Sequence, residues 1–290
     1  MATAIETISH PDAMRRFSKQ QRRADRTVAF VPTMGALHEG HASLIRRAAD
    51  RADCVVTSIF VNPTQFGPNE DFEKYPRTLA ADLDVAAAAG CDVVFTPETS
   101  AMYPEGVHCS VHVKGTIVET FEGASRPGHF DGVATIVAKL FNIVQPDFAV
   151  FGLKDYQQTR VVSALVRDLD FDIELDLAPT SREANGLARS SRNTYLTDEE
   201  RARAALLYQT LQRAAEVAAA GEGSRVRLER LMADMLSADT DIRVDYAQAA
   251  RAQDLSTAAE YAAGEELVFL LAVHLGSVRL IDNITARVGA

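Results

Sequence analysis

The chain has 290 residues, of which 47% are hydrophobic and 24% are charged, and its formal net charge is -10. This length and hydrophobic content allow one large domain or two ordinary ones, and we expect two. The acidic balance argues against nucleic acid as the main partner, because it repels a phosphate backbone. No apolar stretch is long enough for a bilayer, and the N-terminus lacks a signal-peptide layout, so we expect a cytoplasmic protein with no membrane partner.

The first informative segment turns from a strand into a helix. Residues 27–31 are apolar and rich in β-formers, Pro32 and Gly35 then interrupt the strand, and a helical apolar stripe begins at Ala42. Backbone N–H groups at the start of such a helix have no helical partner and attract an anion, usually a phosphate.

Two imidazoles lie at this turn in the spelling HxGH. Because Gly40 separates His38 from His41, a phosphate could approach the backbone while ring N–H groups donate to its oxygens. The spacing of Gly35 and Gly40 approaches a P-loop, but His41 and Ala42 stand where that motif needs Lys and then Ser or Thr. The competing interpretation is a surface loop with two solvated histidines, or one histidine satisfied in a core.

Strand and helix patterns alternate through the rest of the first half. We predict strands at 54–61, 93–96, 148–151 and 171–178, a further strand at 107–113, and helices at 79–89, 131–144 and 156–168. This alternation predicts a parallel α/β sheet with right-handed crossovers, in which ligands bind at the carboxyl ends of the strands.

Polar residues follow several of these strands. Gln65 offers an uncharged amide after the second strand, although an ordinary turn capped by Asn62 explains the same residues. The glycine-rich segment 122–129 brings Arg126 and His129 near a helix start, or is a structural loop.

A second polar cluster opens the helix at 156–168. Lys154, Asp155 and Gln158 are spaced so that all three crowd its N-terminal edge. Lys154 is then an anion partner or the cation of an exposed salt bridge to Asp155.

Three cysteines, Cys54, Cys91 and Cys109, show no CxxC spacing. We expect reduced thiols, with Cys54 buried in a strand, and neither a disulfide nor a zinc site. His108 and His112 would face one side of a strand, but no carboxylate or cysteine joins them at ligand spacing, so we predict no protein metal site.

We place a domain boundary near Thr180, which gives a larger domain at 1–180 and a smaller α+β domain at 181–290. The segment 186–192, GLARSSR, has the composition of loops that close over phosphates, or of a solvated linker. Thr197 and Glu200 predict a capping box for a helix that carries Leu206, Leu207 and Leu211. A helix at 228–236 and strands at 244–247, 267–273 and 278–281 complete a lid or platform.

Five motifs together carry a specific resemblance. TMGALHEGH, IFVNPTQF, RPGHFDGV, GLKDYQQ and SSRN occur in this order between about Val28 and Tyr195, and a looser match, LIDNI, follows at Leu280 to Ile284. The chain resembles the pantothenate synthetase family, the pantoate:β-alanine ligases of coenzyme A biosynthesis. A lone HxGH would indicate only the nucleotidyltransferase superfamily.

The resemblance implies a Rossmann-like α/β domain with a smaller α+β domain, a homodimer, and ATP with Mg2+. The implied reaction joins pantoate to β-alanine through pantoyl adenylate and releases pyrophosphate and AMP. His41 would be the proton donor, and Gln65 and Gln158 would hold pantoate. The implied ATP site comprises Met34, Gly35, Ala36, Leu37, His38, Glu39, Gly40, His41, Gly152, Leu153, Lys154, Asp155, Ser181, Arg189, Ser190, Ser191 and Arg192.

The chemistry of these residues agrees with that reaction. Attack at phosphorus places negative charge on non-bridging oxygens, so donors that are already in place act mainly in the transition state. His38, His41, Lys154 and Arg192 are donors of that kind, and uncharged glutamines orient a hydroxy acid without neutralising its nucleophile.

Two positions depart from the family pattern. Leu153 stands where the family usually has Glu, and Arg189 where it usually has Met. These departures leave open a non-catalytic nucleotide binder. Two rival functions are a different HxGH enzyme acting on a phosphorylated acceptor, whose pocket would need basic residues, and a nucleic-acid or tRNA-charging module.

Overall fold

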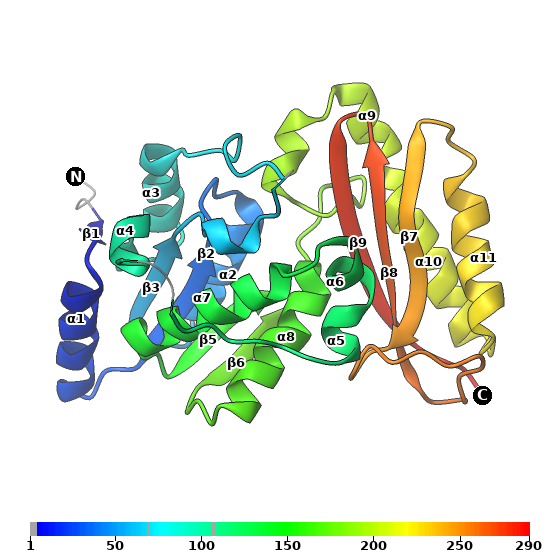
Figure 1. Cartoon of the computed structure of the whole chain (residues 1–290). Coiled ribbons are helices and arrows are strands. Elements are labelled where there is room, and N and C mark those ends of the chain that lie inside the picture. The colour runs from blue at the N-terminus through cyan, green and yellow to red at the C-terminus, as the bar shows by residue number, and fades with distance from the viewer. Residues whose placement is uncertain (1–4, 69, 106–107) are drawn as a thin grey trace. The chain divides into compact units, whose positions relative to one another are not determined.

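The structure is a computed structural model that describes residues 5–68, 70–105 and 108–290 (Figure 1). Contacts group the chain into two compact units, each built from several segments. The first unit comprises Met1–Val113, Arg126–Leu153 and Val161–Pro179, and the second comprises Lys114–Ser125, Lys154–Arg160 and Thr180–Ala290.

Within the described residues, the first unit contains a six-stranded, wholly parallel sheet in the order β1-β4-β3-β2-β5-β6. Its strands are β1 Glu6–Ile8, β2 Val28–Thr33, β3 Cys54–Ile59, β4 Val93–Phe95, β5 Phe148–Gly152 and β6 Glu174–Ala178. Its helices are α1 Pro11–Arg23, α2 Glu39–Ala49, α3 Leu79–Ala88, α4 Thr99–Met102 and α7 His129–Val144, with the short 3-10 helix η1 at Pro63–Gln65. Two further elements, η2 Leu153–Asp155 and α8 Tyr156–Asp168, cross the division between the units.

Alternate residues of β2 explain why the strands read as continuous apolar runs. Ala29 and Val31 belong to a buried cluster that includes Ile45 of α2 and Ala86 of α3. Phe30 instead meets Phe141 of α7 edge-on, with ring centroids 6.4 Å apart. Because helices bury both faces of the sheet, its central strands β2, β3 and β5 are largely apolar, whereas the edge strands β1 and β6 carry exposed acidic residues.

The expectation that Pro32 ends this strand is wrong, since β2 continues to Thr33 with Pro32 paired opposite Ser58. Thr27 and Thr33 accept hydrogen bonds from the β3 side, so the intervening Pro32 faces the β5 side. Pairing with β5 stops at Phe30, so the missing N–H of Pro32 interrupts no ladder.

The predicted strand at 107–113 is also wrong for residues 108–113, while Val107 lies outside the described residues. Val111 N donates to Thr135 Oγ1 at 2.9 Å and Val113 N to Asp131 Oδ1 at 3.0 Å. Side chains of α7 thus satisfy backbone groups that a neighbouring strand would otherwise need to pair.

Other boundaries differ for local reasons. The chain turns at Phe171–Ile173, so β6 begins only at Glu174. Neither β1 nor α1 was predicted, because β1 has only three residues and α1 buries only Pro11, Met14 and Ser18.

The second unit is an antiparallel sheet with helices, which confirms the prediction of a smaller α+β part in addition to a Rossmann-like parallel sheet. Its strands follow the order β7-β8-β9, with β7 at Ile242–Arg251, β8 at Glu266–Leu275 and β9 at Val278–Arg287. The helical elements are α5 Thr116–Glu119, α6 Phe121–Ser125, η3 Ser191–Tyr195, α9 Asp198–Arg203, α10 Ala205–Ala219 and α11 Arg225–Leu236.

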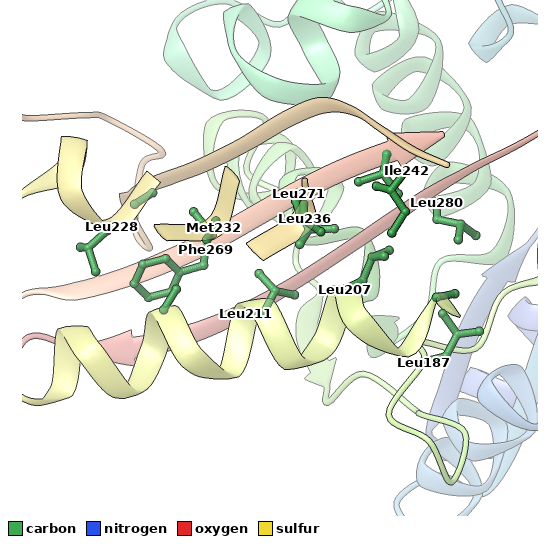
Figure 2. Packing of buried hydrophobic residues seen from close by; sticks show 14 of the residues in the cluster. Leu187, Leu207, Leu211, Leu228, Met232, Leu236, Ile242, Phe269, Leu271 and Leu280 are labelled. Carbon is green, nitrogen blue, oxygen red and sulfur yellow. The ribbon is translucent and has the colours of Figure 1, made fainter. Parts of the chain in front are cut away.

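Figure 2 shows the core of this unit, where Leu207 and Leu211 of α10 lie with Phe269 and Leu271 of β8. Leu187, from the loop before η3, belongs to the same cluster and is 2% exposed. The Thr197 and Glu200 capping box is present, but it caps the short α9, and the predicted leucines lie on the separate α10.

Candidate active site

Strand order indicates where the first unit would bind a ligand. The chain runs outward from β2 through β3 to β4 on one side and through β5 to β6 on the other. The carboxyl ends of β2 and β5 therefore flank the point where the order reverses, which is where open α/β sheets bind ligands. Gly152 ends β5 close to α2, since a Cβ added there would lie 3.8 Å from Leu44 Cδ1.

The two imidazoles of the HxGH turn cap α2. His38 is the N-cap residue, with extended backbone, and its Nδ1 accepts from Gly40 N at 3.1 Å. His41 Nδ1 accepts in return from His38 N at 3.3 Å, and the ring centroids are 4.2 Å apart. Since Nδ1 accepts in both rings, the neutral form of each carries its proton on Nε2. Both rings are half-buried, so the arrangement differs from two solvated histidines in a surface loop.

A buried carboxylate holds the turn that precedes this cap. Asp82 of α3 is 2% exposed, and it accepts from Ala36 N at 3.0 Å and Leu37 N at 2.8 Å. Gly35 and Ala36 have φ of +86° and +50°, which is uncommon for a residue with a side chain. Asp82 thus stabilises a turn whose backbone alone would not favour this shape.

Gln65, the predicted pantoate residue of this unit, is buried at the end of η1. Its Oε1 accepts from Asn62 Nδ2 at 3.2 Å, and its Nε2 lies 2.9 Å from Met34 Sδ. Asn62 also donates to Gly132 O and accepts from Tyr103 at 2.8 Å. Asn62 therefore does more than cap a turn, because it fixes the Gln65 amide beside the HxGH segment.

Arg126 and His129 hold the backbone of Gln65. His129 Nδ1 lies 2.7 Å from Gln65 O, and Arg126 forms a two-pronged ion pair with Glu70 at 2.7 and 2.6 Å. Burial raises the pKa of the Glu70 carboxyl, but the hydrogen bonds and charge of Arg126 outweigh this, and the pKa is lowered. Arg126 and His129, just before and at the start of α7, thus support Gln65.

Of the predicted site residues after β5, Leu153 belongs to the first unit, whereas Lys154, Asp155 and Gln158 belong to the second. Lys154 Nζ lies 3.4 Å from Asp155 Oδ1, and the Lys154 side chain is 22% exposed. Tyr156 Oη donates to Ala252 O at 2.7 Å, and Gln157 Nε2 donates to Ile117 O at 2.9 Å. These bonds fix the first turn of α8, which carries Gln158.

The predicted phosphate loop, residues 186–192, begins in a tight hairpin with an antiparallel bridge between Arg182 and Ala188 and ends in η3. Arg189 N donates to Ser181 O at 2.9 Å, and Gly186 has a φ of +92°. A Cβ at Gly186 would come within 2.5 Å of Tyr208 Cδ1. Gly186 therefore permits a close approach in a fixed turn, and the hairpin leads directly into Ser190, Ser191 and Arg192.

The structure shows the environment of the two residues that depart from the family pattern. Leu153 is half-buried in η2, and Arg189 Nε donates to Arg182 O at 3.2 Å. Arg189 is thus a member of the hairpin through its side chain as well as its backbone.

Within the described ranges, neither metal-ligating residues nor thiols form a further candidate site. There, no group of three or more His, Cys, Asp or Glu residues could hold a metal ion. Cys54 is buried as predicted, Cys91 is also buried, and all three cysteines are free. Burial raises the pKa of Cys54 to about 12 and that of Cys91 to about 11, so both stay protonated thiols at neutral pH.

The site residues that sequence reasoning missed are supports for the predicted ones. Asp82 lay in an alanine-rich helix with no motif, and Arg182 lay beside a proposed domain boundary. The LIDNI segment was the one signal for Asp282 and Asn283, whose contacts involve both Arg182 and Lys154.

Among the described residues, no helix is both long and apolar enough to cross a membrane.

The parallel sheet and its imidazole-capped turn define an α/β enzyme of the HxGH nucleotidyltransferase class. The family model for pantoate-beta-alanine ligase matches residues 6–285. The pantothenate synthetase of Carboxydothermus hydrogenoformans is 49% identical over 275 residues, which cover 95% of this chain and 96% of that protein. The chain therefore belongs to the pantoate-beta-alanine ligase family, and it is a ligase of pantothenate synthesis.

Solved structures agree in fold. The crystal structure of pantothenate synthetase from Thermus thermophilus has a TM-score of 0.89 at 44% identity, with 97% of this chain and 99% of that chain covered. The pantoate-beta-alanine ligase from Francisella tularensis, complexed with beta-gamma ATP and beta-alanine, has a TM-score of 0.80 at 33% identity, covering 97% of each chain. Both likenesses extend over nearly the whole length, so they include both units.

Proposed function

We propose that this ligase condenses pantoate with β-alanine in an ATP-dependent reaction, through a pantoyl-adenylate intermediate, and releases pyrophosphate and AMP. The observation that carries the proposal is the reciprocal cap of His38 and His41 at the carboxyl edge of β2. The Francisella tularensis relative, complexed with beta-gamma ATP and beta-alanine, supports ATP and β-alanine as substrates here.

In the first step, a pantoate carboxylate oxygen attacks the α-phosphorus of ATP and the bond to pyrophosphate breaks. His38 and His41 donate from Nε2 to phosphate oxygens, because Nδ1 of each ring already accepts from the backbone. His41 is the proton donor in this proposal. Donors fixed before the reaction stabilise the charge that develops, without the cost of reorganising at that moment.

Gln65 and Gln158 hold pantoate in this proposal. Both are uncharged, so they orient the hydroxy acid while its carboxylate remains a nucleophile. In the second step the β-alanine amine attacks the acyl carbon of the adenylate, and the bond to AMP breaks. A phosphorylated acceptor would instead need cations, whereas the Gln65 amide contacts Asn62 and Met34, and the nearby Arg126 is paired with Glu70.

The remaining ATP contacts are assigned to the segments that the family resemblance implies. These are Met34 to His41, Gly152 to Asp155, Ser181, and Arg189 to Arg192, with Lys154 and Arg192 as cationic donors to the phosphates. We propose that Mg2+ arrives with ATP as part of the substrate, since Mg2+ commonly keeps its waters and binds through phosphates with one or two carboxylates. Asp155, with a side chain 46% exposed, is a carboxylate suited to that contact.

We also propose a cytoplasmic homodimer in which residues 1–180 and 181–290 act as the two domains. The second domain then serves as a lid or platform for the first. The size of the purified protein would test the homodimer, and the location of the protein in cells would test the cytoplasmic assignment. Both tests are separate from the chemistry.

The deciding experiment is exchange of labelled pyrophosphate into ATP. We expect exchange that requires pantoate and does not require β-alanine, because the adenylate forms before the amine reacts. Exchange that ran equally well without pantoate would overturn the substrate assignment. Exchange supported by a phosphorylated acceptor in place of pantoate would favour the rival HxGH chemistry.

A further inference from the structure

One arginine joins several segments of the second unit. Arg182 donates to both oxygens of Asp282, at 2.7 and 2.9 Å, and the Asp282 side chain is only 1% exposed. The guanidinium also lies over the ring of Tyr208, 3.8 Å from its centroid, and donates to Gly186 O at 3.0 Å. These contacts hold the Arg182 side chain in place, and they therefore also hold the hairpin that contains it.

The next residue of β9 reaches a different part of the proposed ATP site. Asn283 Nδ2 donates to Lys154 O at 2.8 Å, and Asn283 is 6% exposed. Its backbone N–H donates to Asp282 Oδ1 at 2.7 Å, and its carbonyl accepts from Arg182 at 3.1 Å. Two consecutive residues therefore hold Lys154 on one side and the hairpin on the other.

The charged groups around Asp282 oppose the effect of its burial. Burial raises the pKa of the Asp282 carboxyl, while the Arg182 guanidinium and the positive charge of Lys154 oppose that rise. Both cations therefore interact favourably with the charged form of Asp282.

The position of Arg182 determines the positions of the hairpin residues that are proposed to contact ATP. Ser181 and Arg189 are joined across its base by a backbone hydrogen bond of 2.9 Å, and Leu187 anchors its tip side in the hydrophobic core. A displacement of Arg182 would therefore move Ser181 and Arg189 together.

We propose that Asp282 and Asn283 are positioning residues that set the distance between Lys154 and the Ser181–Arg189 hairpin before ATP binds. Neither residue needs to contact ATP, because each acts through a group that does. This inference rests on the proposed function, in which Lys154 and the hairpin hold the nucleotide. Preorganised cations favour the transition state of attack at phosphorus more than loosely held ones do.

Asn283→Leu is the main test, because leucine has a similar size but no donor for Lys154 O. The expected result is a rise of about tenfold in KM for ATP during pantoate-dependent exchange, with kcat also lowered. KM for pantoate should stay the same, because Tyr156 and Gln157 anchor the turn that carries Gln158 independently. Asp282→Asn should change the same constants in the same direction.

Glu122→Gln is the matched control. Glu122 is also a buried carboxylate in a two-pronged pair with an arginine of β9, since Arg279 donates to it at 2.9 and 2.6 Å. Its loss should lower the melting temperature but leave KM for ATP unchanged. A merely structural role for Asn283 would reduce the active fraction, and so kcat, without raising KM for ATP.

The inference is overturned if both β9 variants keep the KM for ATP of the parent enzyme, or if Glu122→Gln raises it equally. Failure of the proposed function would look different, because the unchanged enzyme would then show no pantoate-dependent exchange. In that event, calorimetric ATP binding decides: weaker binding by Asn283→Leu than by Glu122→Gln supports positioning, and equal binding contradicts it.

Discussion

The HxGH turn and the Ser181–Arg189 hairpin both present groups proposed to bind phosphate, but they are held in place differently. In the turn, the imidazoles cap each other's backbone within four residues, and Asp82 accepts two backbone N–H groups. In the hairpin, the central guanidinium is paired with a carboxylate 100 residues away, and an aromatic ring covers it.

This difference separates two ways to preorganise an anion site. Backbone N–H groups carry no net charge. In the turn, a buried carboxylate already accepts from two of them, so the nearby imidazoles remain as the donors to an incoming phosphate. A fixed guanidinium needs a counter-ion, and removing one partner of such a buried pair is strongly destabilising. We therefore expect changes in the turn to affect chemistry most, and changes in the hairpin to affect ATP binding and stability together.

The largest effect should come from His41→Ala. Loss of one preorganised donor should cost about 3 kcal/mol in the barrier, a fall of roughly a hundredfold in the exchange rate. Because His41 Nδ1 also accepts from His38 N, the same change should lower the free energy of unfolding by about 1 kcal/mol.

His41→Asn separates these two contributions. The Asn Oδ1 occupies a place similar to that of Nδ1, so the cap persists while the Nε2 donor is lost. Exchange should fall as far as in His41→Ala, while urea unfolding should match the parent enzyme. A normal exchange rate in the Asn variant would remove His41 from the mechanism.

The same contrast explains what could be read from the sequence. The HxGH imidazoles and the uncharged Gln65 followed strand ends, and strand ends in a parallel sheet are predictable from apolar runs and turn residues. Asp82 could not be found this way, since its partners are backbone groups of residues 46 and 45 positions away, and backbone groups leave no mark on the sequence.

Errors in the predicted fold have the same origin. Pro32 appeared to end β2 because its missing N–H was counted without knowing that pairing with β5 stops at Phe30. Residues 108–113 looked like a strand, but Thr135 and Asp131 satisfy their backbone groups. In both cases a non-local partner decided the outcome.

Asp82→Asn should have the next largest effect. An amide keeps one acceptor but turns a donor toward a backbone N–H, and a buried group left unpaired costs about 2 kcal/mol. Exchange should fall as well, because Gly35 and Ala36 lose the group that stabilises their positive φ. Asp84→Asn, an exposed change on the same helix, should alter neither urea unfolding nor exchange; equal effects of the two changes would show that Asp82 does not hold the turn.

The smallest expected difference, about 1.5 kcal/mol between two glycine variants, distinguishes flexibility from close packing in the hairpin. Gly186→Ala and Gly264→Ala each place a side chain at a positive φ, which costs about 1 kcal/mol in unfolding free energy. Only Gly186 has a neighbour in the way: a Cβ there meets Tyr208, whereas nothing lies within 4 Å of one at Gly264. Gly186→Ala should therefore lose about 1.5 kcal/mol more than Gly264→Ala, through overpacking, and should raise KM for ATP because Tyr208 supports Arg182. If the two variants unfold alike and bind ATP alike, Gly186 serves only the mobility of a loop, and the contrast between a locally capped turn and a distantly anchored hairpin is wrong.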